Sequence, residues 1–318
     1  LTEVDTLDNI MFFGNEFTGG QYSVKTASVV ENRSQNIYFH DNEFNDFKYR
    51  GIELIRTDVV EVLRNRFSTG STSNGKQQTA IYIDDARFRI DTNELGIPIT
   101  YRSVDIEKNF ISIYDNFNGA KRGIHLVDIS GVETTQNNIF NNMVSIYGST
   151  SNNSSGIIIE GSRYLKVFFN TVRVYAGINA ATSKAMNLYT GCYQATVKNN
   201  IFANLSQGYA YYIANDTAID LSDYNAIFSN SEAAVPKYMY WGAEFQALDS
   251  VRVAKGQELH SVNIQPYFVS DTDVHLDNCL YPAMAQYNAE VSDDIDGNIR
   301  PQIPAPTIGA HEYDCETH

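Results

Sequence analysis

The chain has 318 residues, a formal net charge of −15 and a pI near 4.7. So acidic a chain offers no basic stripe to displace counterions from a nucleic-acid backbone, which excludes nucleic acid as the expected partner. No apolar run approaches 18 residues, so we expect no membrane span. No charged-then-apolar leader opens the chain, so we expect a soluble chain or an excised mature region.

The most regular feature is an asparagine that recurs every 22 to 32 residues. Alternating apolar residues precede it, as in residues 37–44 and 60–67, so each phrase predicts a strand followed by a tight corner. Asn tolerates left-handed backbone and its amide can bond the Asn of the next repeat, which predicts a stacked ladder. The predicted ladder residues are Asn15, Asn42, Asn65, Asn93, Asn116, Asn138, Asn170, Asn200 and Asn225.

A second phrase lies 13 to 15 residues before most of these asparagines and predicts another strand in each repeat. It reads small, apolar, variable, aliphatic, as in Gly51-Ile52-Glu53-Leu54 and Gly156-Ile157-Ile158-Ile159. The apolar positions should point into one core. They are Ile52, Leu54, Ile81, Ile83, Ile124, Leu126, Ile157, Ile159, Met186 and Leu188.

Short strands that repeat without helical patterns between them exclude a doubly wound α/β fold. An up-and-down sandwich would not need the same corner residue in each repeat. We therefore predict an all-β, right-handed parallel β-helix, a solenoid of about nine coils that rise roughly 4.8 Å each. Residues 1–235 should form the coils, and residues 236–318 an irregular C-terminal capping segment packed on the same domain.

Two segments interrupt the repeat, and the first strand begins abruptly. Residues 70–75 and 152–155 are rich in Gly, Ser and Asn and predict protruding loops, which serve either for binding or as tolerated insertions. Residues 9–15 already form a repeat strand, so we expect an upstream segment, or a cap from another domain of a longer chain.

The segment after residue 235 contains six of the seven prolines. Cys279 and Cys315 both lie there and can pair, although free thiols are the simpler expectation; with Cys192 they lack the spacing of a zinc site.

The C-terminal motifs resemble a known family. They are Gly256-Gln257-Glu258-Leu259-His260-Ser261, Gln265-Pro266-Tyr267-Phe268-Val269, Asp273-Val274-His275-Leu276, residues 294–301 (DIDGNIRP) and residues 308–313 (IGAHEY). This tail is similar to the closing segment of secreted right-handed β-helix repeat proteins of Bacteroidetes-type bacteria. The chain departs from the family where Gln265 and Tyr267 replace the Asp and Leu of a DPLF motif. The resemblance implies a secreted or cell-surface location; some members look like parts of large exported proteins, others like polysaccharide lyases or hydrolases.

The outward positions of the second-phrase strands form a mixed polar and aromatic column. Aromatic rings that stack on sugars and charged groups that hold hydroxyls would make a polysaccharide-binding face, whereas a solvated sheet surface is the simpler alternative. The candidate substrate-binding residues are Arg50, Glu53, Tyr82, Asp84, Glu160, Asn187, Tyr189 and Tyr212, with Lys184 beside them.

Two kinds of catalysis are conceivable on this face. Lys121, Arg122 and His125 form the compact basic group that a lyase would need to abstract a proton and neutralise a carboxylate. A hydrolase needs two carboxylates across one bond. Asp84 and Asp85 should point to opposite faces. We expect two intervening coils, at about 4.8 Å each, to leave Asp84 too far from Glu160, and Asp128, one coil closer to Glu160, to lie in another column.

Asp294, Asp296 and Asn298 resemble part of a calcium loop, so Ca²⁺ is a candidate cofactor, although an Asp-Gly turn explains the same residues. No other cofactor is expected. The sequence favours a carbohydrate-binding or structural segment of an exported protein, with a polysaccharide lyase or glycosidase as the alternative.

Overall fold

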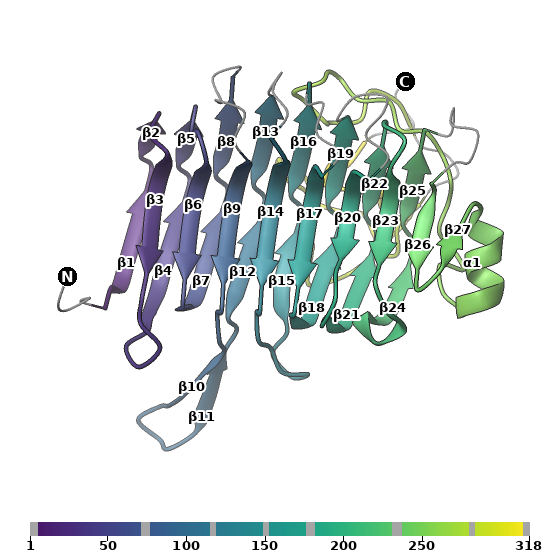
Figure 1. Ribbon diagram of the computed structural model, residues 1–318. Helices are drawn as coiled ribbons and strands as arrows, with labels where there is room; N and C mark the ends of the chain where they lie inside the picture. The colour runs from purple at the N-terminus through teal and green to yellow at the C-terminus, as the bar shows by residue number, and fades with distance from the viewer. Residues whose placement is uncertain are drawn as a thin grey trace.

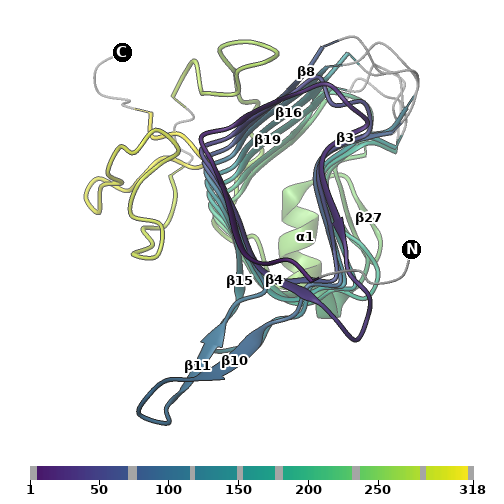
Figure 2. The same cartoon turned by 90° about the vertical axis from the view of Figure 1, so that its left-hand side faces the viewer.

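The computed structural model describes residues 6–70, 77–114, 119–148, 153–175, 182–230, 237–279 and 284–313. They form a sheet-rich, repeat-like fold with three large parallel sheets, consistent with a β-helix (Figure 1). Within each sheet, neighbouring strands come from successive repeats of the sequence. The end-on view shows the three sheets facing a common interior (Figure 2).

The first sheet contains the strands that precede the ladder asparagines. In sheet order they are β1 (Asp8–Phe13), β4 (Ser34–His40), β7 (Thr57–Leu63), β12 (Val104–Glu107), β15 (Asn137–Phe140), β18 (Arg163–Phe168), β21 (Tyr193–Lys198) and β24 (Ile219–Asp223).

The second sheet begins just after those asparagines. Its strands are β2 (Glu16–Thr18), β5 (Glu43–Asn45), β8 (Arg66–Thr69), β13 (Phe110–Tyr114), β16 (Met143–Tyr147), β19 (Thr171–Tyr175), β22 (Ile201–Asn204) and β25 (Ala226–Ser229).

The third sheet contains the second-phrase strands. They are β3 (Tyr22–Ala27), β6 (Arg50–Ile55), β9 (Gln78–Asp84), β14 (Lys121–Val127), β17 (Ser155–Glu160), β20 (Lys184–Leu188), β23 (Tyr209–Ile213) and β26 (Met239–Trp241), followed by the antiparallel β27 (Glu244–Phe245). The third sheet thus extends past residue 235.

The core is apolar, as the alternating pattern predicts. All ten side chains predicted to point inward are completely buried. Aromatic rings stack from one repeat to the next, as in Phe17 on Phe44 and Phe44 on Phe67. Buried residues from successive repeats belong to one continuous hydrophobic cluster.

The asparagine ladder is confirmed, but two of its predicted members are not in it and a third is not described. Asn93 lies in a hairpin, Asn116 lies outside the described residues, and Asn138 lies within β15, where its amide donates only to Glu107 at 3.4 Å. Asn109 and Asn142 take the vacant positions. The observed ladder runs through Asn15, Asn42, Asn65, Asn109, Asn142, Asn170, Asn200 and Asn225.

The left-handed backbone expected at the ladder asparagine lies one residue earlier. The residue with positive φ is the one before the ladder asparagine, as in Asp41 (φ 57°), Lys108 (φ 55°) and Phe169 (φ 56°). The ladder asparagine is needed for its amide. Each one accepts a backbone N–H and a side-chain N–H from the preceding ladder residue, so it satisfies groups that a closed corner would otherwise bury unpaired.

One repeat carries an insertion that the sequence did not reveal. The antiparallel hairpin of β10 (Arg89–Thr92) and β11 (Pro98–Tyr101) projects away from the sheets (Figures 1 and 2). Its residue Asn93 accepts from the amides of Leu95 and Ile97, as a turn residue does. Of the two predicted loops, residues 71–75 and Asn152 lie outside the described residues, while Ser155 belongs to β17.

A short helix lies over the end of the stack. A 3-10 turn (Asp216–Ala218) precedes strand β24. The only α-helix in the described part of the chain is α1 (Leu248–Lys255), whose Leu248 and Val251 belong to the hydrophobic core. It ends at Gly256, where a φ of 64° favours glycine.

The segment after α1 packs against the outside of the first two sheets (Figure 2). Leu276, Ala285, Val291 and Ile308 contact a patch that includes Phe168. Within this segment Cys279 is disulfide-bonded, and Cys192 in the coils is a buried free thiol. Cys315 lies outside the described residues.

The two most characteristic tail motifs meet at one buried arginine. The guanidinium group of Arg300 lies 3.9 Å from the centre of the Phe169 ring and donates to Glu312 Oε2 at 2.9 Å and to Asn141 Oδ1 at 2.8 Å. Gly309 in the second motif has φ 94°, and a Cβ there would lie 2.6 Å from Ile201. Through these contacts, residues 294–301 and 308–313 hold the tail against the parallel sheets.

Candidate functional site

The outer surface of the third sheet brings the candidate binding residues into register. Its central column, in strand order, is Lys25, Glu53, Tyr82, His125, Ile158, Asn187, Tyr212 and Tyr240. One flanking column contains Arg50, Arg122 and Lys184, and the other contains Asp84 and Glu160. We call this surface the third-sheet face.

The first half of the third-sheet face is a network of paired charges. Glu53, almost fully buried, forms ion pairs with Arg50 and with Lys25, the latter at 2.8 Å. The Arg50 guanidinium lies 3.5 Å from the centre of the Tyr82 ring, and the Tyr82 hydroxyl donates to Asp84 at 3.1 Å. These contacts fix Tyr82 in place, so its ring belongs to the network.

His125 lies at the centre of the network. Burial, together with the guanidinium groups of Arg122 and Arg50, lowers the pKa of His125 to about 3, so its ring is neutral near neutral pH. Arg122 Nη1 lies 3.1 Å from Nδ1, which must then accept, and Nε2 donates to Glu160 Oε1 at 2.9 Å. A ring with both nitrogens occupied is a poor general base.

In the basic group predicted for a lyase, Arg122 and His125 do lie together, but each is engaged by a neighbour. Lys121 is completely buried at the start of β14, while Arg122 and His125 are engaged with each other and with Glu160. No compact cluster of free bases remains among the described residues that the sequence singled out here.

Three carboxylates gather where the third sheet turns towards the first. Asp84 and Glu160 both pair with Val127, so one strand lies between them and the expectation of two intervening coils was wrong. Their separation is about 9.6 Å from two strand spacings. Burial raises the pKa of Asp84 and of Glu160, and the charge of Asp128 raises both further. Asp85, in contrast, forms ion pairs with Arg33, Arg56 and Arg87.

A groove of about 700 Å³ opens along this corner. Its lining includes Asp128, Arg163 and Tyr193. Gly161 permits it, because a Cβ there would lie 1.9 Å from the Asp128 carboxylate oxygen. This groove was not predicted from the sequence, although a polar or glycine residue directly follows β9, β14 and β17, at Asp85, Asp128 and Gly161.

The second half of the third-sheet face is a tyrosine platform, formed by Tyr189, Tyr209, Tyr212 and Tyr240. Tyr212 and Tyr240 stack with centroids 4.5 Å apart, Tyr189 stacks on Tyr212 at 6.5 Å, and Tyr209 contacts both Tyr212 and Tyr240 edge-on. Tyr209 and Tyr240 were not among the predicted residues, although Tyr240 follows Tyr212 in the same column.

Two lysines and a carboxylate border the platform. Lys184 Nζ lies 5.0 Å from the Tyr212 ring centre, and Lys237 Nζ lies 5.2 Å from that of Tyr209. The Tyr209 hydroxyl donates to Glu244 at 2.6 Å. Asn187 is nearly fully buried between the two halves of the face, beside Ile158. The platform is therefore a cluster of aromatic rings with charged groups at its edge.

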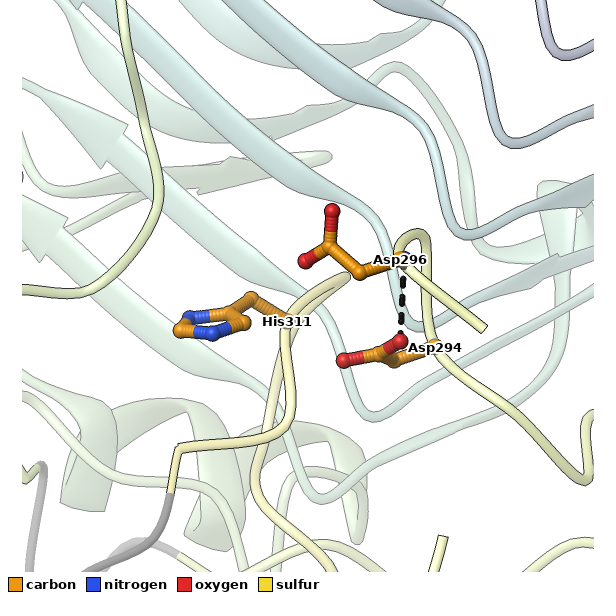
Figure 3. Close-up of side chains that lie close together, drawn as sticks. All are labelled: Asp294, Asp296 and His311. Atoms are coloured by element: carbon orange, nitrogen blue, oxygen red, sulfur yellow. Dashed lines mark hydrogen bonds between the residues drawn. The ribbon is translucent and has the colours of Figure 1, made fainter. Parts of the chain in front are cut away.

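The three residues predicted to bind calcium have different roles in the structure. Asp294 accepts the backbone N–H of Asp296 and of Asn298, and the Asn298 side chain donates to Asp294 at 3.1 Å. This is a turn closed on Asp294, in which the amide of Asn298 acts as a donor. Asp294 and Asp296 instead lie close to His311, which the sequence analysis did not single out (Figure 3).

No family model matches this chain, and no match was found among curated proteins or among solved structures. Within the described residues, no helix has the length and apolarity needed to cross a bilayer.

Proposed function

We propose that this chain is a right-handed parallel β-helix module of a secreted or cell-surface bacterial protein, and that it binds a polysaccharide along the third-sheet face. The observation that carries the proposal is the tyrosine platform. Four rings from three neighbouring repeats lie in contact, and Tyr189 is 42% exposed. Aromatic faces bordered by hydrogen-bonding groups suit sugar rings, which present an apolar face and an equatorial rim of hydroxyls.

The charged half of the face supports an extended ligand. The platform lies at one end of the central column. His125, which is bonded to Arg122 and Glu160, lies in the same column, with β17 and β20 between it and Tyr212. A glycan chain that follows the stack of coils would contact both halves. The secreted location and the bacterial origin depend on the resemblance of the tail motifs.

The binding proposal predicts a local effect of Tyr212→Ala. We expect affinity for a bound oligosaccharide to fall by about 1–2 kcal/mol, or roughly 5- to 30-fold in Kd, because a stacking surface is lost. A glycan array identifies the ligand and calorimetry gives the Kd. Tyr175→Ala is the matched control, since Tyr175 is comparably exposed, at 40%, but lies on the second sheet.

Two outcomes would contradict this proposal. If no glycan on the array binds, the chain is a structural segment of a larger protein. If Tyr175→Ala weakens binding as much as Tyr212→Ala does, the ligand does not lie on the platform.

One observation favours a glycoside hydrolase as a second candidate over a lyase. Asp84 and Glu160 directly precede Asp85 and Gly161, which line the corner groove, and their backbones are about 9.6 Å apart by strand spacing, close to the upper limit of about 9.5 Å for carboxyl pairs in inverting glycosidases. Their raised pKa values suit a group that must hold a proton. One carboxyl group would protonate the glycosidic oxygen, while the other would activate water.

The hydrolase candidate predicts new reducing ends without unsaturated products. Asp84→Asn and Glu160→Gln should each lower turnover by about 10²-fold or more, whereas Glu133→Gln, which changes an exposed carboxylate before β15, should not. Products that absorb as unsaturated uronates would instead indicate a lyase. Absence of turnover on every glycan that binds would leave binding alone.

A further inference from the structure

A second candidate site lies in the tail, on the opposite side of the coils from the tyrosine platform. Asp294, Asp296 and His311 each offer a ligand atom, and these atoms all lie within 4.8 Å of one another. Figure 3 shows the three side chains gathered between two segments of the tail, with Asp294 joined to the backbone of Asp296. This is a mixed nitrogen and oxygen donor set, not a purely acidic cluster.

Asp294 is held rigidly. It is completely buried and accepts hydrogen bonds from the backbone N–H groups of Asp296, Asn298 and Glu312. A fourth bond, from the Asn298 side chain at 3.1 Å, is the longest of the four. A cation approaching Asp294 Oδ2 would replace that bond, because the Asn298 side chain can rotate away while the backbone amides cannot.

Asp296 is oriented by a histidine from a third segment. His275 bonds through Nδ1 to Asp273, and its Nε2 lies 3.1 Å from Asp296 Oδ2. The His275 ring also contacts His311 at 4.9 Å between centroids and stacks on Phe110 at 6.1 Å. Such a carboxylate–histidine relay is the usual means by which outer groups fix the orientation of a metal ligand.

His311 provides the independent sign of a ligand. Its Nδ1 is buried and has no hydrogen-bond partner among the described residues. A buried, unpaired polar atom costs about 1–3 kcal/mol unless a partner satisfies it.

We propose that Asp294, Asp296 and His311 bind one divalent transition-metal ion, of which Zn²⁺ is the representative. An imidazole nitrogen with two carboxylates suits Zn²⁺ or Mn²⁺, whereas Ca²⁺ takes six to eight oxygen ligands. Water would complete the coordination, and His275 acts as a positioning residue that stays outside it.

The metal would join segments that the chain brings together only in the folded tail. Residues 294–296 and 311 lie on either side of Arg300, and His275 adds the segment that stacks on Phe110 of the coils. Because the ligands are assembled only in the folded chain, binding energy becomes folding energy. The site therefore has a structural role and stands independently of carbohydrate binding.

The test uses the tag-free chain after chelator treatment. Calorimetry with Zn²⁺, Mn²⁺ and Ca²⁺ gives stoichiometry and affinity, and thermal unfolding gives the shift in Tm. We expect one equivalent of Zn²⁺ and a raised Tm. Asp296→Asn, at a partly exposed side chain, and His311→Phe, which keeps a ring, should each weaken Zn²⁺ binding by about 100-fold or more, since even outer-shell changes lose 10- to 100-fold.

Matched controls separate the site from general charge effects. Asp277→Asn and His260→Phe make the same chemical changes elsewhere in the tail and should leave Zn²⁺ affinity unchanged. If wild-type protein shows no stoichiometric Zn²⁺ or Mn²⁺ binding, the proposal fails. It also fails if Asp296→Asn binds Zn²⁺ normally, or if Ca²⁺ binds more tightly than Zn²⁺ and His311→Phe does not affect it. Should His311→Phe not fold, Asp296→Asn decides alone.

Discussion

Replacing Asn170 by Ala should lower the free energy of unfolding by about 3–5 kcal/mol, the range reached when several buried polar groups lose partners together. Asn170 is completely buried. Its amide donates to the carbonyl of Ile139 at 2.7 Å and to Asn200 Oδ1 at 3.0 Å, and its own Oδ1 accepts both the backbone and the side-chain N–H of Asn142. The change strands groups in the repeats on both sides, which alanine cannot satisfy.

The matched control is Asn138→Ala, at an asparagine that the sequence alone places in the ladder. Its Oδ1 has no partner among the described residues and its amide makes one bond of 3.4 Å, so we expect a loss within about 1 kcal/mol. Chemical denaturation of both variants gives the comparison. Equal losses would mean that the ladder bonds do not stabilise the fold.

Replacing Arg300 by Met should release the tail at a loss of about 3–5 kcal/mol, as expected when one partner of a buried ion pair is removed. The Arg300 side chain is fully buried, and burial lowers its pKa to about 10, so the guanidinium remains charged near neutral pH. Without it, Glu312, Asn141 Oδ1 and the Gly309 carbonyl lose a donor.

Hydrogen exchange locates the effect. Amides of residues 284–313 should exchange faster in Arg300→Met, while those of the third sheet should keep their protection. Adding Glu312→Gln should recover part of the loss, because it removes the unpaired carboxylate. Arg87→Met, at a side chain 52% exposed, is the control. If the tail amides stay protected from exchange in Arg300→Met, the contacts of Arg300 do not hold the tail in place.

Periodicity predicted the all-β class, the parallel pairing and the inward residues, because alternation has only one solution when one face of a strand is buried. It could not place the ladder in every repeat. Asn93 and Asn138 resemble ladder residues locally, and only the pairing of Glu107 with Phe140 shows that Asn109 and Asn142 occupy the corner. The choice depends on contacts 33 residues apart, which a local pattern does not contain.

The sequence predicted which side chains share the outer surface of the third sheet, but not which side chains they contact. The phrase with Glu53, His125 and Tyr212 placed these side chains on one surface. Whether a given side chain there is free depends on neighbours from other repeats: Tyr82 is held by Arg50, and His125 by Glu160. His311 was missed because its partners, Asp294 and Asp296, come from another part of the tail and its spacing matches no metal motif.

The hairpin of β10 and β11 shows where this architecture accepts foreign sequence. Asn42 and Asn65 are 23 residues apart and Asn65 and Asn109 are 44 apart, yet both pairs make the same amide contact, at 2.9 Å and 3.1 Å. Closing a longer loop adds little free energy, since the entropic term grows only with the logarithm of length. The corner after β9 can therefore accept an inserted peptide without a change in the spacing between neighbouring strands.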